Sequence, residues 1–214
     1  MQQEYKARLL QGIEGLNVEI PNDKVDELIE YHRLLVKWNS AYNLTAVRNA
    51  MDMIDRHLID SLGIIEYLSD VKRLIDVGTG GGMPGLIIAI MFPQMHVTLL
   101  DSNGKKTRFL QQVKTSLKLA NVTIVQSRLE AFDVPQNELF DCITSRAFAT
   151  LKDMIDKSNQ LLAKDGQYLA MKGVNPVEEI SQLPLGFKVN KVLPLTIPFA
   201  DGERHIVSII RSND

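Results

Sequence analysis

A cluster of five glycines within eight positions constrains this chain more than any other feature. They are Gly78, Gly80, Gly81, Gly82 and Gly85. They follow a short apolar run at 74–77 that is typical of a buried strand. Pro84 suits the first turn of a helix, and the apolar stretch 86–91 continues that helix. The pattern predicts a strand, a glycine loop and a helix N-terminus that bind a nucleotide-type cofactor, with backbone amides and the helix dipole facing the ligand.

A second part of the predicted site lies about 20 residues beyond the glycine loop. Residues 96–101 read as the next strand, and that strand ends in the carboxylate of Asp101. An acid at this point can accept hydrogen bonds from both hydroxyls of a ribose. We therefore expect a cofactor that carries an adenosine or a similar ribose.

Two cofactors fit the glycine spacing. Residues 80–85 match the G-x-G-x-x-G of dinucleotide binders, and residues 76–82 match the acid-x-G-x-G-x-G of S-adenosylmethionine methyltransferases. A carboxylate at Asp76 is well placed to face the ammonium of a methionine moiety, but it would repel a pyrophosphate. The helix dipole would favour the methionine carboxylate at its N-terminus. These charges favour S-adenosylmethionine, and a nicotinamide-dependent oxidoreductase is the alternative.

The order of predicted elements divides the chain into a helical extension at 1–70 and an α/β domain at 71–214. In the second part, strands are predicted at 73–78, 96–101, 122–126, 140–145 and 167–172, helices at 84–92, 104–119, 150–163 and 176–182, and two extended segments at 187–197 and 205–210. Alternating strands and helices imply a mostly parallel sheet, here seven-stranded, with helices on both faces. The two final strands predict an antiparallel hairpin at its edge. This Rossmann-like arrangement resembles the class I S-adenosylmethionine methyltransferases.

Composition sets limits on partners and location. The chain has 214 residues, a formal net charge of −2 and one cysteine, Cys142. Neither a run of about 18 apolar residues nor an apolar leader occurs, so we expect a cytoplasmic protein with no membrane partner. No His, Cys, Asp or Glu cluster has metal-ligand spacing, so no metal is predicted. An RNA partner requires basic residues gathered on one face, and Lys105 and Arg108 are the candidates for phosphate contacts.

The polar stretch at 38–48 separates two helical patterns. It is interpreted either as a loop with a function or as residues that cap the neighbouring helices.

The absence of certain reactive residues narrows the choice of the atom that accepts the methyl group. Cys142 lies within a predicted buried strand without the proline that precedes the nucleophile of cytosine C5 enzymes. The Asn/Asp-Pro-Pro-aromatic loop of exocyclic-amine enzymes is replaced by residues 145–148, Ser-Arg-Ala-Phe. A ring nitrogen such as guanine N7 has an in-plane lone pair and needs no base. Arg146 then suits positioning and charge stabilisation as the catalytic residue, because its planar fork can contact base or cofactor.

Several longer motifs point to one family. They are Lys37-Trp-Asn39, Tyr42-Asn-Leu-Thr45, Arg56-His57, Asp60-Ser61, Asp76-Val-Gly-Thr-Gly80, Leu100-Asp-Ser102, Gln126-Ser-Arg128, Ser145-Arg-Ala-Phe148, Lys172-Gly173 and Gly202-Glu-Arg-His205. Together they resemble the RsmG (GidB, glucose-inhibited division protein B) family of small-subunit ribosomal RNA guanine-N7 methyltransferases over nearly the whole chain. Gly81 and Met83 stand where this family often has proline and leucine.

The resemblance implies a bacterial enzyme that moves a methyl group from S-adenosylmethionine to N7 of one guanine in 16S ribosomal RNA of the small subunit. It implies cofactor contacts at Gly78, Met83, Leu129, Glu130 and Arg146, with Asp101 at the ribose, and the glycine-loop pattern adds Asp76 and Gly80 to the expected contacts. It implies substrate contacts at Asn43, Arg56, His57, Lys172 and Arg204. We expect a monomer, and a non-catalytic ribosome-binding protein is a further alternative.

Overall fold

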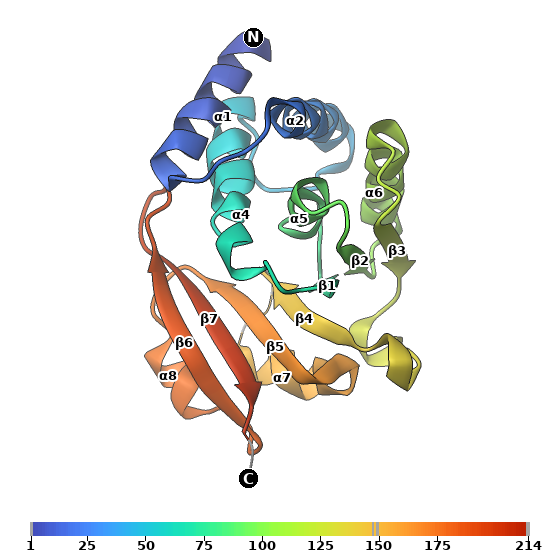
Figure 1. Ribbon diagram of the computed structural model, residues 1–214. Helices are drawn as coiled ribbons and strands as arrows, with labels where there is room; N and C mark the ends of the chain where they lie inside the picture. The colour runs from blue at the N-terminus through green and yellow to red at the C-terminus, as the bar shows by residue number, and fades with distance from the viewer. Residues whose placement is uncertain (1, 147, 149, 213–214) are drawn as a thin grey trace.

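A seven-stranded sheet organises the chain in the computed structural model, which describes residues 2–146, 148 and 150–212 (Figure 1). Its strands are β1 Arg73–Val77, β2 His96–Asp101, β3 Val122–Gln126, β4 Phe140–Ser145, β5 Leu162–Lys172, β6 Phe187–Leu195 and β7 Arg204–Arg211. The spatial order is β3-β2-β1-β4-β5-β7-β6. The first five are parallel, whereas β7 runs antiparallel to both β5 and β6. The predicted parallel sheet with a terminal antiparallel hairpin is confirmed.

The chain reverses direction across the sheet between β1 and β4. From β1 it proceeds outward to β2 and β3, and it then returns to β4 on the other side of β1. In open parallel sheets the crevice for a ligand forms beyond the carboxyl ends of the strands at this switch point. The glycine loop follows β1 directly, so it lies at that crevice.

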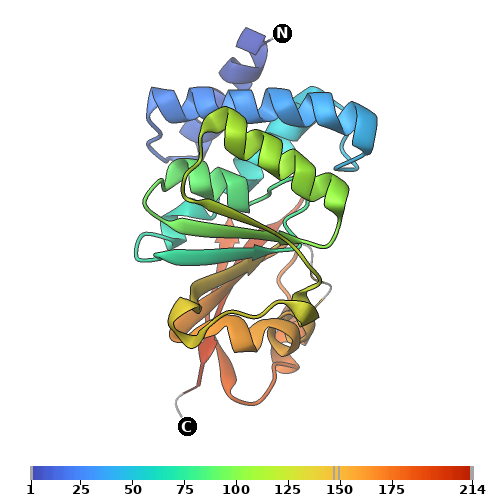
Figure 2. The ribbon, with the colours of Figure 1, turned by 90° about the vertical axis from the view of Figure 1, so that its right-hand side faces the viewer.

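Helices cover both faces of the sheet (Figures 1 and 2). One face carries α5 Gly85–Met91 and α6 Gly104–Leu117, and the other carries α7 Leu151–Ser158 and α8 Val177–Ser181. Each face has its own cluster of buried apolar side chains. The strands between them are therefore rich in buried Leu, Ile and Val, as expected for a sheet covered on both sides. Cys142 is fully buried in β4, and this burial raises the pKa of its thiol, as suits an inert core residue.

The N-terminal segment forms an additional helical layer over α5 and α6 (Figure 2). It contains α1 Gln2–Leu16, α2 Asn22–Tyr42, α3 Ala50–Met53, the π-helix η1 Ile54–Ile59 and α4 Asp60–Leu62. Its apolar residues belong to the same buried cluster as those of α5 and α6. The extension is thus packed on the sheet domain through a shared hydrophobic core, and the boundary at residue 70 stays a prediction.

Short 3-10 helices complete the described chain. They are η2 Ile65–Tyr67, η3 Leu129–Ala131, η4 Gln136–Glu138 and η5 Asn159–Leu161. Within the described residues, no helix has the length and apolar character needed to cross a bilayer.

Three predicted boundaries were wrong. Helix α2 continues to Tyr42, so the polar stretch at 38–48 is half helix. The packing of Trp38 against Phe109, with ring centroids 5.7 Å apart, outweighs the polar composition. The helix predicted at 150–163 ends earlier. Strand β5 begins at Leu162, because Leu162 pairs with Phe140 before a bulge in the ladder.

Candidate active site

The glycine loop closes on itself. The amides of Gly78 and Thr79 both donate to the Leu100 carbonyl, at 2.8 and 3.1 Å. Gly80 N donates to Asp101 Oδ2 at 2.9 Å, and the amides of residues 82 and 83 donate to the Thr79 carbonyl. These five amides therefore have acceptors within the loop or at the end of β2, and the expectation that loop amides face a ligand stays a prediction. A pyrophosphate would need such donors, so this arrangement disfavours a dinucleotide.

Positive φ angles shape this turn. Gly78, Gly80 and Gly82 have φ values of 69°, 60° and 95°. A Cβ on Gly80 would meet no atom closer than 3.9 Å and would project into the open space before the loop. The loop therefore presents a wall without side chains at which a ligand can approach the backbone.

The buried side chain of Asp76 is hydrogen-bonded to the glycine loop. Its side chain is fully buried, and Oδ2 accepts from the Thr79 hydroxyl at 2.7 Å and from the Gly85 amide at 2.8 Å. Burial raises the pKa of Asp76 to about 6, against the opposing effect of these hydrogen bonds. Asp76 lines neither cavity, and its expected contact with the cofactor's ammonium stays a prediction. Asp76 fixes the start of α5 relative to the turn.

Helix α2 reaches the same loop from the outer layer. The Tyr31 hydroxyl donates to the Gly81 carbonyl at 2.7 Å, and Tyr31 is fully buried. Burial raises the pKa of this phenol, which keeps it protonated as a donor. The N-terminal extension is thus hydrogen-bonded to the turn that shapes the site.

A cavity of about 580 Å³ opens in front of the loop. Its lining includes the predicted residues Gly78, Gly80, Met83, Arg56, His57, Arg146, Lys172 and Arg204. These residues come from the N-terminal segment, the ends of β1, β4 and β5, and the start of β7. The structure therefore brings most of the predicted cofactor and substrate residues to one opening.

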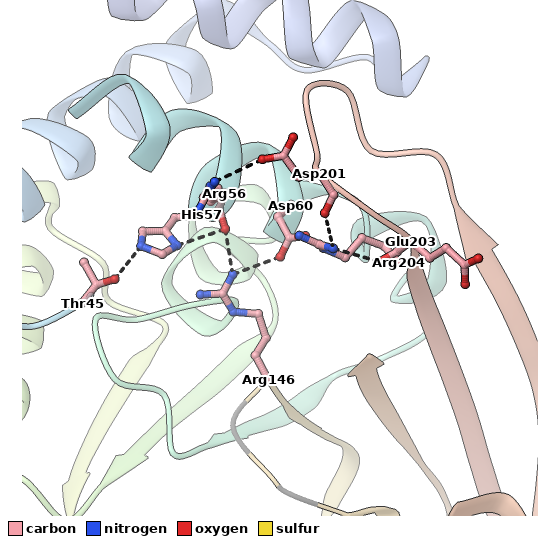
Figure 3. A network of polar contacts seen from close by, with 8 residues as sticks. All are labelled: Thr45, Arg56, His57, Asp60, Arg146, Asp201, Glu203 and Arg204. Atoms are coloured by element: carbon pink, nitrogen blue, oxygen red, sulfur yellow. Dashed lines mark hydrogen bonds and ion pairs between the residues drawn. The ribbon is translucent and has the colours of Figure 1, made fainter. Parts of the chain in front are cut away.

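Asp60 holds two arginines at this cavity (Figure 3). Its Oδ2 accepts from Arg146 Nη1 at 3.1 Å, and its Oδ1 accepts from Arg204 Nε at 2.8 Å. Arg146 Nη1 also donates to the carbonyl of Arg56 at 3.3 Å. Only 9% of the Asp60 side chain is exposed, against 22% for Arg146. One nearly buried carboxylate therefore orients two guanidinium groups that reach solvent through the cavity.

The π-helix η1 supplies Arg56 and His57 just before Asp60. π-helical turns are rare and often occur at functional sites. Because a carbonyl only accepts, His57 must donate from Nδ1 to the Arg56 carbonyl, 3.0 Å away. Its Nε2 then accepts from the Thr45 hydroxyl at 2.8 Å. This chain of hydrogen bonds fixes the neutral tautomer of the ring.

His57 is consequently a poor phosphate ligand. Burial, and next the charge of Arg146, lower the pKa of His57 to about 4. The ring is neutral at physiological pH and only 7% exposed. The structure gives it the role of aligning the Arg56 carbonyl, which in turn holds Arg146 (Figure 3).

A second cavity, of about 340 Å³, adjoins the first at Gly78 and Lys106. It contains Asp101, Leu129 and Glu130, which were all predicted as cofactor contacts. Asp101 Oδ1 accepts from the Asn103 amide at 2.9 Å, and Lys106 Nζ lies 3.5 Å from Oδ2. These residues fit an adenosine. An acid stands at the end of β2, an apolar side chain lies beside it, and the glycine wall leads to the larger cavity.

The remaining predicted contacts have local partners. Lys172 Nζ binds Glu179 at 2.8 Å, and Arg56 Nη2 lies 3.1 Å from Asp201. Asn43 is the left-handed C-cap of α2, and its Oδ1 accepts from Arg48. Asn43 lines neither cavity, so its predicted substrate contact is not supported by its position.

Sequence reasoning missed several residues of the site. They are Thr45, Asp60, Lys106, Phe148 and His205. Lys105 and Arg108, which were selected as phosphate contacts, are exposed on α6 and line neither cavity. Successive helical residues point about 100° apart, and Lys106 is the one directed to the site. Among described residues, no group of three or more His, Cys, Asp or Glu could hold a metal.

The sheet order, the glycine turn at its switch point and the acid ending β2 define a class I S-adenosylmethionine methyltransferase. The fold is shared with solved methyltransferases. Ribosomal protein L11 methylase from Lactobacillus delbrueckii subsp. bulgaricus superposes with a TM-score of 0.55 and 18% identity, over 74% of this chain and 79% of that one.

Sequence comparison then gives the family. The profile of GidB, rRNA small subunit methyltransferase G, matches residues 24–207. Proteins named ribosomal RNA small subunit methyltransferase G are 49% identical in Chromobacterium violaceum, over 96% of this chain and 98% of theirs, and 48% identical in Pseudomonas aeruginosa strain LESB58, over 98% and 97%. The chain belongs to the GidB family of S-adenosylmethionine-dependent ribosomal RNA methyltransferases.

Proposed function

We propose that this protein transfers the methyl group of S-adenosylmethionine to N7 of one guanine in 16S ribosomal RNA, acting as a monomer in the bacterial cytoplasm. The observation that carries the proposal is the position of Arg146. It lies at the cavity in front of the glycine loop, with Nη1 held by Asp60 and by the Arg56 carbonyl. Among described residues, the hydrogen bonds of this guanidinium all use Nη1. Nε and Nη2 are then donors for a ligand.

Guanine N7 suits a site of this kind. S-adenosylmethionine supplies a methyl group on a positively charged sulfur. The N7 lone pair can attack this methyl without loss of a proton, and the positive charge moves from sulfur to the purine. Arg146 can donate to O6, which is adjacent to N7, and leave the N7 lone pair free. His57 is not required as a base, since its Nε2 already accepts from Thr45.

In this proposal the two cavities bind different parts of the cofactor and the RNA. Asp101, Leu129 and Glu130 would hold the adenosine in the smaller cavity, and Gly78, Gly80 and Met83 would border the methionine end. Arg56, Lys172 and Arg204 would face the RNA at the larger opening. We propose the extension at 1–70 as the RNA side, because it contributes Arg56 and Asp60 to this opening.

The experiment uses unmethylated small ribosomal subunits and S-adenosylmethionine labelled in the methyl group. The wild-type protein should label one guanine at N7, and Arg146→Ala should lower kcat by at least about 100-fold. A circular-dichroism melt of Arg146→Ala shows that the chain remains folded. Absence of label at guanine N7 with the wild type would overturn the function. Wild-type turnover by a folded Arg146→Ala would remove Arg146 from the mechanism.

A further inference from the structure

Helix α6 is the most basic element of a chain that is acidic overall. It carries Lys105, Lys106, Arg108 and Lys114, ends at Lys118, and contains no acidic residue, although the chain has a net charge of −2. Within the described residues, only Lys106 of this group forms an ion pair, with Asp101. The exposed positive charges of α6 are therefore not neutralised by the described part of the fold.

Helices α2 and α6 lie side by side (Figure 2), and residues of both line a groove. Its volume is about 440 Å³, and its lining includes Lys37, Trp38, Tyr42, Gln112 and Ser116. The Trp38 and Tyr42 rings lie 5.2 Å apart, and Tyr42 is 46% exposed. An exposed aromatic ring beside unpaired cations is the combination that binds unstacked nucleotides.

The groove leads to the active site. Tyr42 ends α2, and two residues later Leu44 and Thr45 line the larger cavity. Lys106, in the first turn of α6, lines both cavities. Arg108 is exposed one helical turn before Gln112, on the same face of α6 and nearer to its N-terminal end, where Lys106 lies. An RNA strand in the groove would thus continue directly into the opening where Arg146 lies.

We propose that the α2–α6 groove binds unpaired ribosomal RNA next to the target guanine. A base stacks on Tyr42, and Lys37 and Arg108 bind the adjacent phosphates. Arg33 is left out of this role because Glu30 already binds it at 2.7 Å. The inference rests on the proposed function, since it assumes an RNA substrate, and it adds the face by which that RNA is held.

The first test compares steady-state kinetics of charge variants on unmethylated small subunits. Lys37→Gln/Arg108→Gln should raise KM for subunits about tenfold, with kcat and the KM for S-adenosylmethionine unchanged. The slope of log KM against log salt concentration should fall by about 1.4, since each single-strand phosphate contact contributes about 0.7. The matched control is Lys188→Gln/Lys191→Gln, which removes two exposed lysines on β6, at the opposite edge of the sheet. Wild-type KM and salt slope in the groove variant, or an equal loss in the control, would overturn the proposal.

The second test addresses stacking. Tyr42→Ala should raise KM for subunits about tenfold, and Tyr42→Phe should restore it, because the ring supplies the contact. Equal KM values for Tyr42→Ala and the wild type would contradict the role of Tyr42.

The third test identifies the partner. A photoreactive benzoylphenylalanine placed at Gln112 should cross-link to ribosomal RNA within the assembled subunit, near the methylated guanine. Cross-links to ribosomal proteins alone, or none, would overturn RNA as the occupant. Co-sedimentation of the same variants with subunits needs no methyl transfer. It therefore still tests the groove if the wild type fails to methylate guanine N7, an outcome that would overturn the proposed function alone.

Discussion

Arg146 Nη1 lies 3.1 Å from Asp60 Oδ2, across 86 positions of sequence. The other oxygen of the same carboxylate binds Arg204. Three segments that are distant in sequence, the start of α4, the residue after β4 and the start of β7, therefore meet at one negative charge. Asp60 thus helps to fix the position of the Arg146 guanidinium.

Loss of Asp60 should impair catalysis through Arg146. We expect Asp60→Ala to lower kcat about 100-fold, because a small displacement of a positioning group has effects of this size, with little change in the affinity for S-adenosylmethionine. Asp60→Glu should recover part of the activity. Asp201→Ala is the matched control, since Asp201 binds Arg56 but its side chain is 90% exposed. Methyl-transfer kinetics and calorimetric titration of cofactor check this, and a fall in affinity without a fall in kcat would contradict it.

His57 should make stability depend on pH. Its folded pKa of about 4 lies below the ordinary 6.5, so the unfolded chain binds more protons between these values. The stabilisation is complete above about pH 6.5 and is lost as pH falls towards 4, by on the order of 3 kcal/mol. Asp76 has the opposite effect, because its folded pKa of about 6 exceeds the ordinary 3.8. Its contribution stabilises the fold below about pH 3.8 and is lost as pH rises towards 6.

The comparison of wild type with His57→Gln separates the two effects, since Asp76 is present in both. Urea unfolding at pH 4.5 to 7 should show a free-energy difference between the two proteins that grows with pH. Parallel curves would show that His57 titrates normally.

Gly82 should not accept a side chain. A Cβ there would lie 2.3 Å from Leu86 Cδ1, and φ is +95°. Gly202 has a similar φ of +87°, but a Cβ there meets nothing within 4 Å. Gly202→Ala should therefore cost about 1 kcal/mol of stability from backbone strain alone. Gly82→Ala should cost about 1–3 kcal/mol more and should weaken cofactor binding. Denaturant unfolding and calorimetry measure both effects, and equal losses in the two variants would contradict the clash.

Removal of the Tyr31 hydroxyl should loosen the glycine loop. Tyr31→Phe leaves the buried Gly81 carbonyl without this donor, and we expect a loss of about 1–3 kcal/mol in stability with severalfold weaker cofactor binding. Tyr168→Phe is the control, because Tyr168 is also buried but its hydroxyl contacts Ser158, away from the loop. If both variants bind cofactor like the wild type, the Tyr31 contact does not shape the site.

Local patterns in the sequence were sufficient for the sheet. Buried strands and amphipathic helices have their own periodicities, and the glycine cluster marks the turn at the switch point. Asp101 was identified for the same reason, because its place at the end of β2 follows from the strand alone. The hydrogen bonds of Asp76 to Thr79 and Gly85 were not predicted, because they depend on how the glycine turn folds over β1.

Contacts between distant segments could not be predicted from such local patterns. Asp60 stands in an ordinary helical stretch, and only the fold brings Arg146 and Arg204 to it. Lys106, which the sequence analysis did not select, lines both cavities, whereas its neighbour Lys105 is exposed, because successive residues on a helix point about 100° apart.

The hydrogen bond between Tyr31 and Gly81 has a thermodynamic consequence for substrate order. Helix α2 lines the proposed RNA groove, and its Tyr31 is also hydrogen-bonded to the glycine loop. This helix is therefore a physical connection through which binding at one place can affect binding at the other. Whatever factor RNA imposes on the affinity for S-adenosylmethionine, the cofactor must impose the same factor on the affinity for RNA.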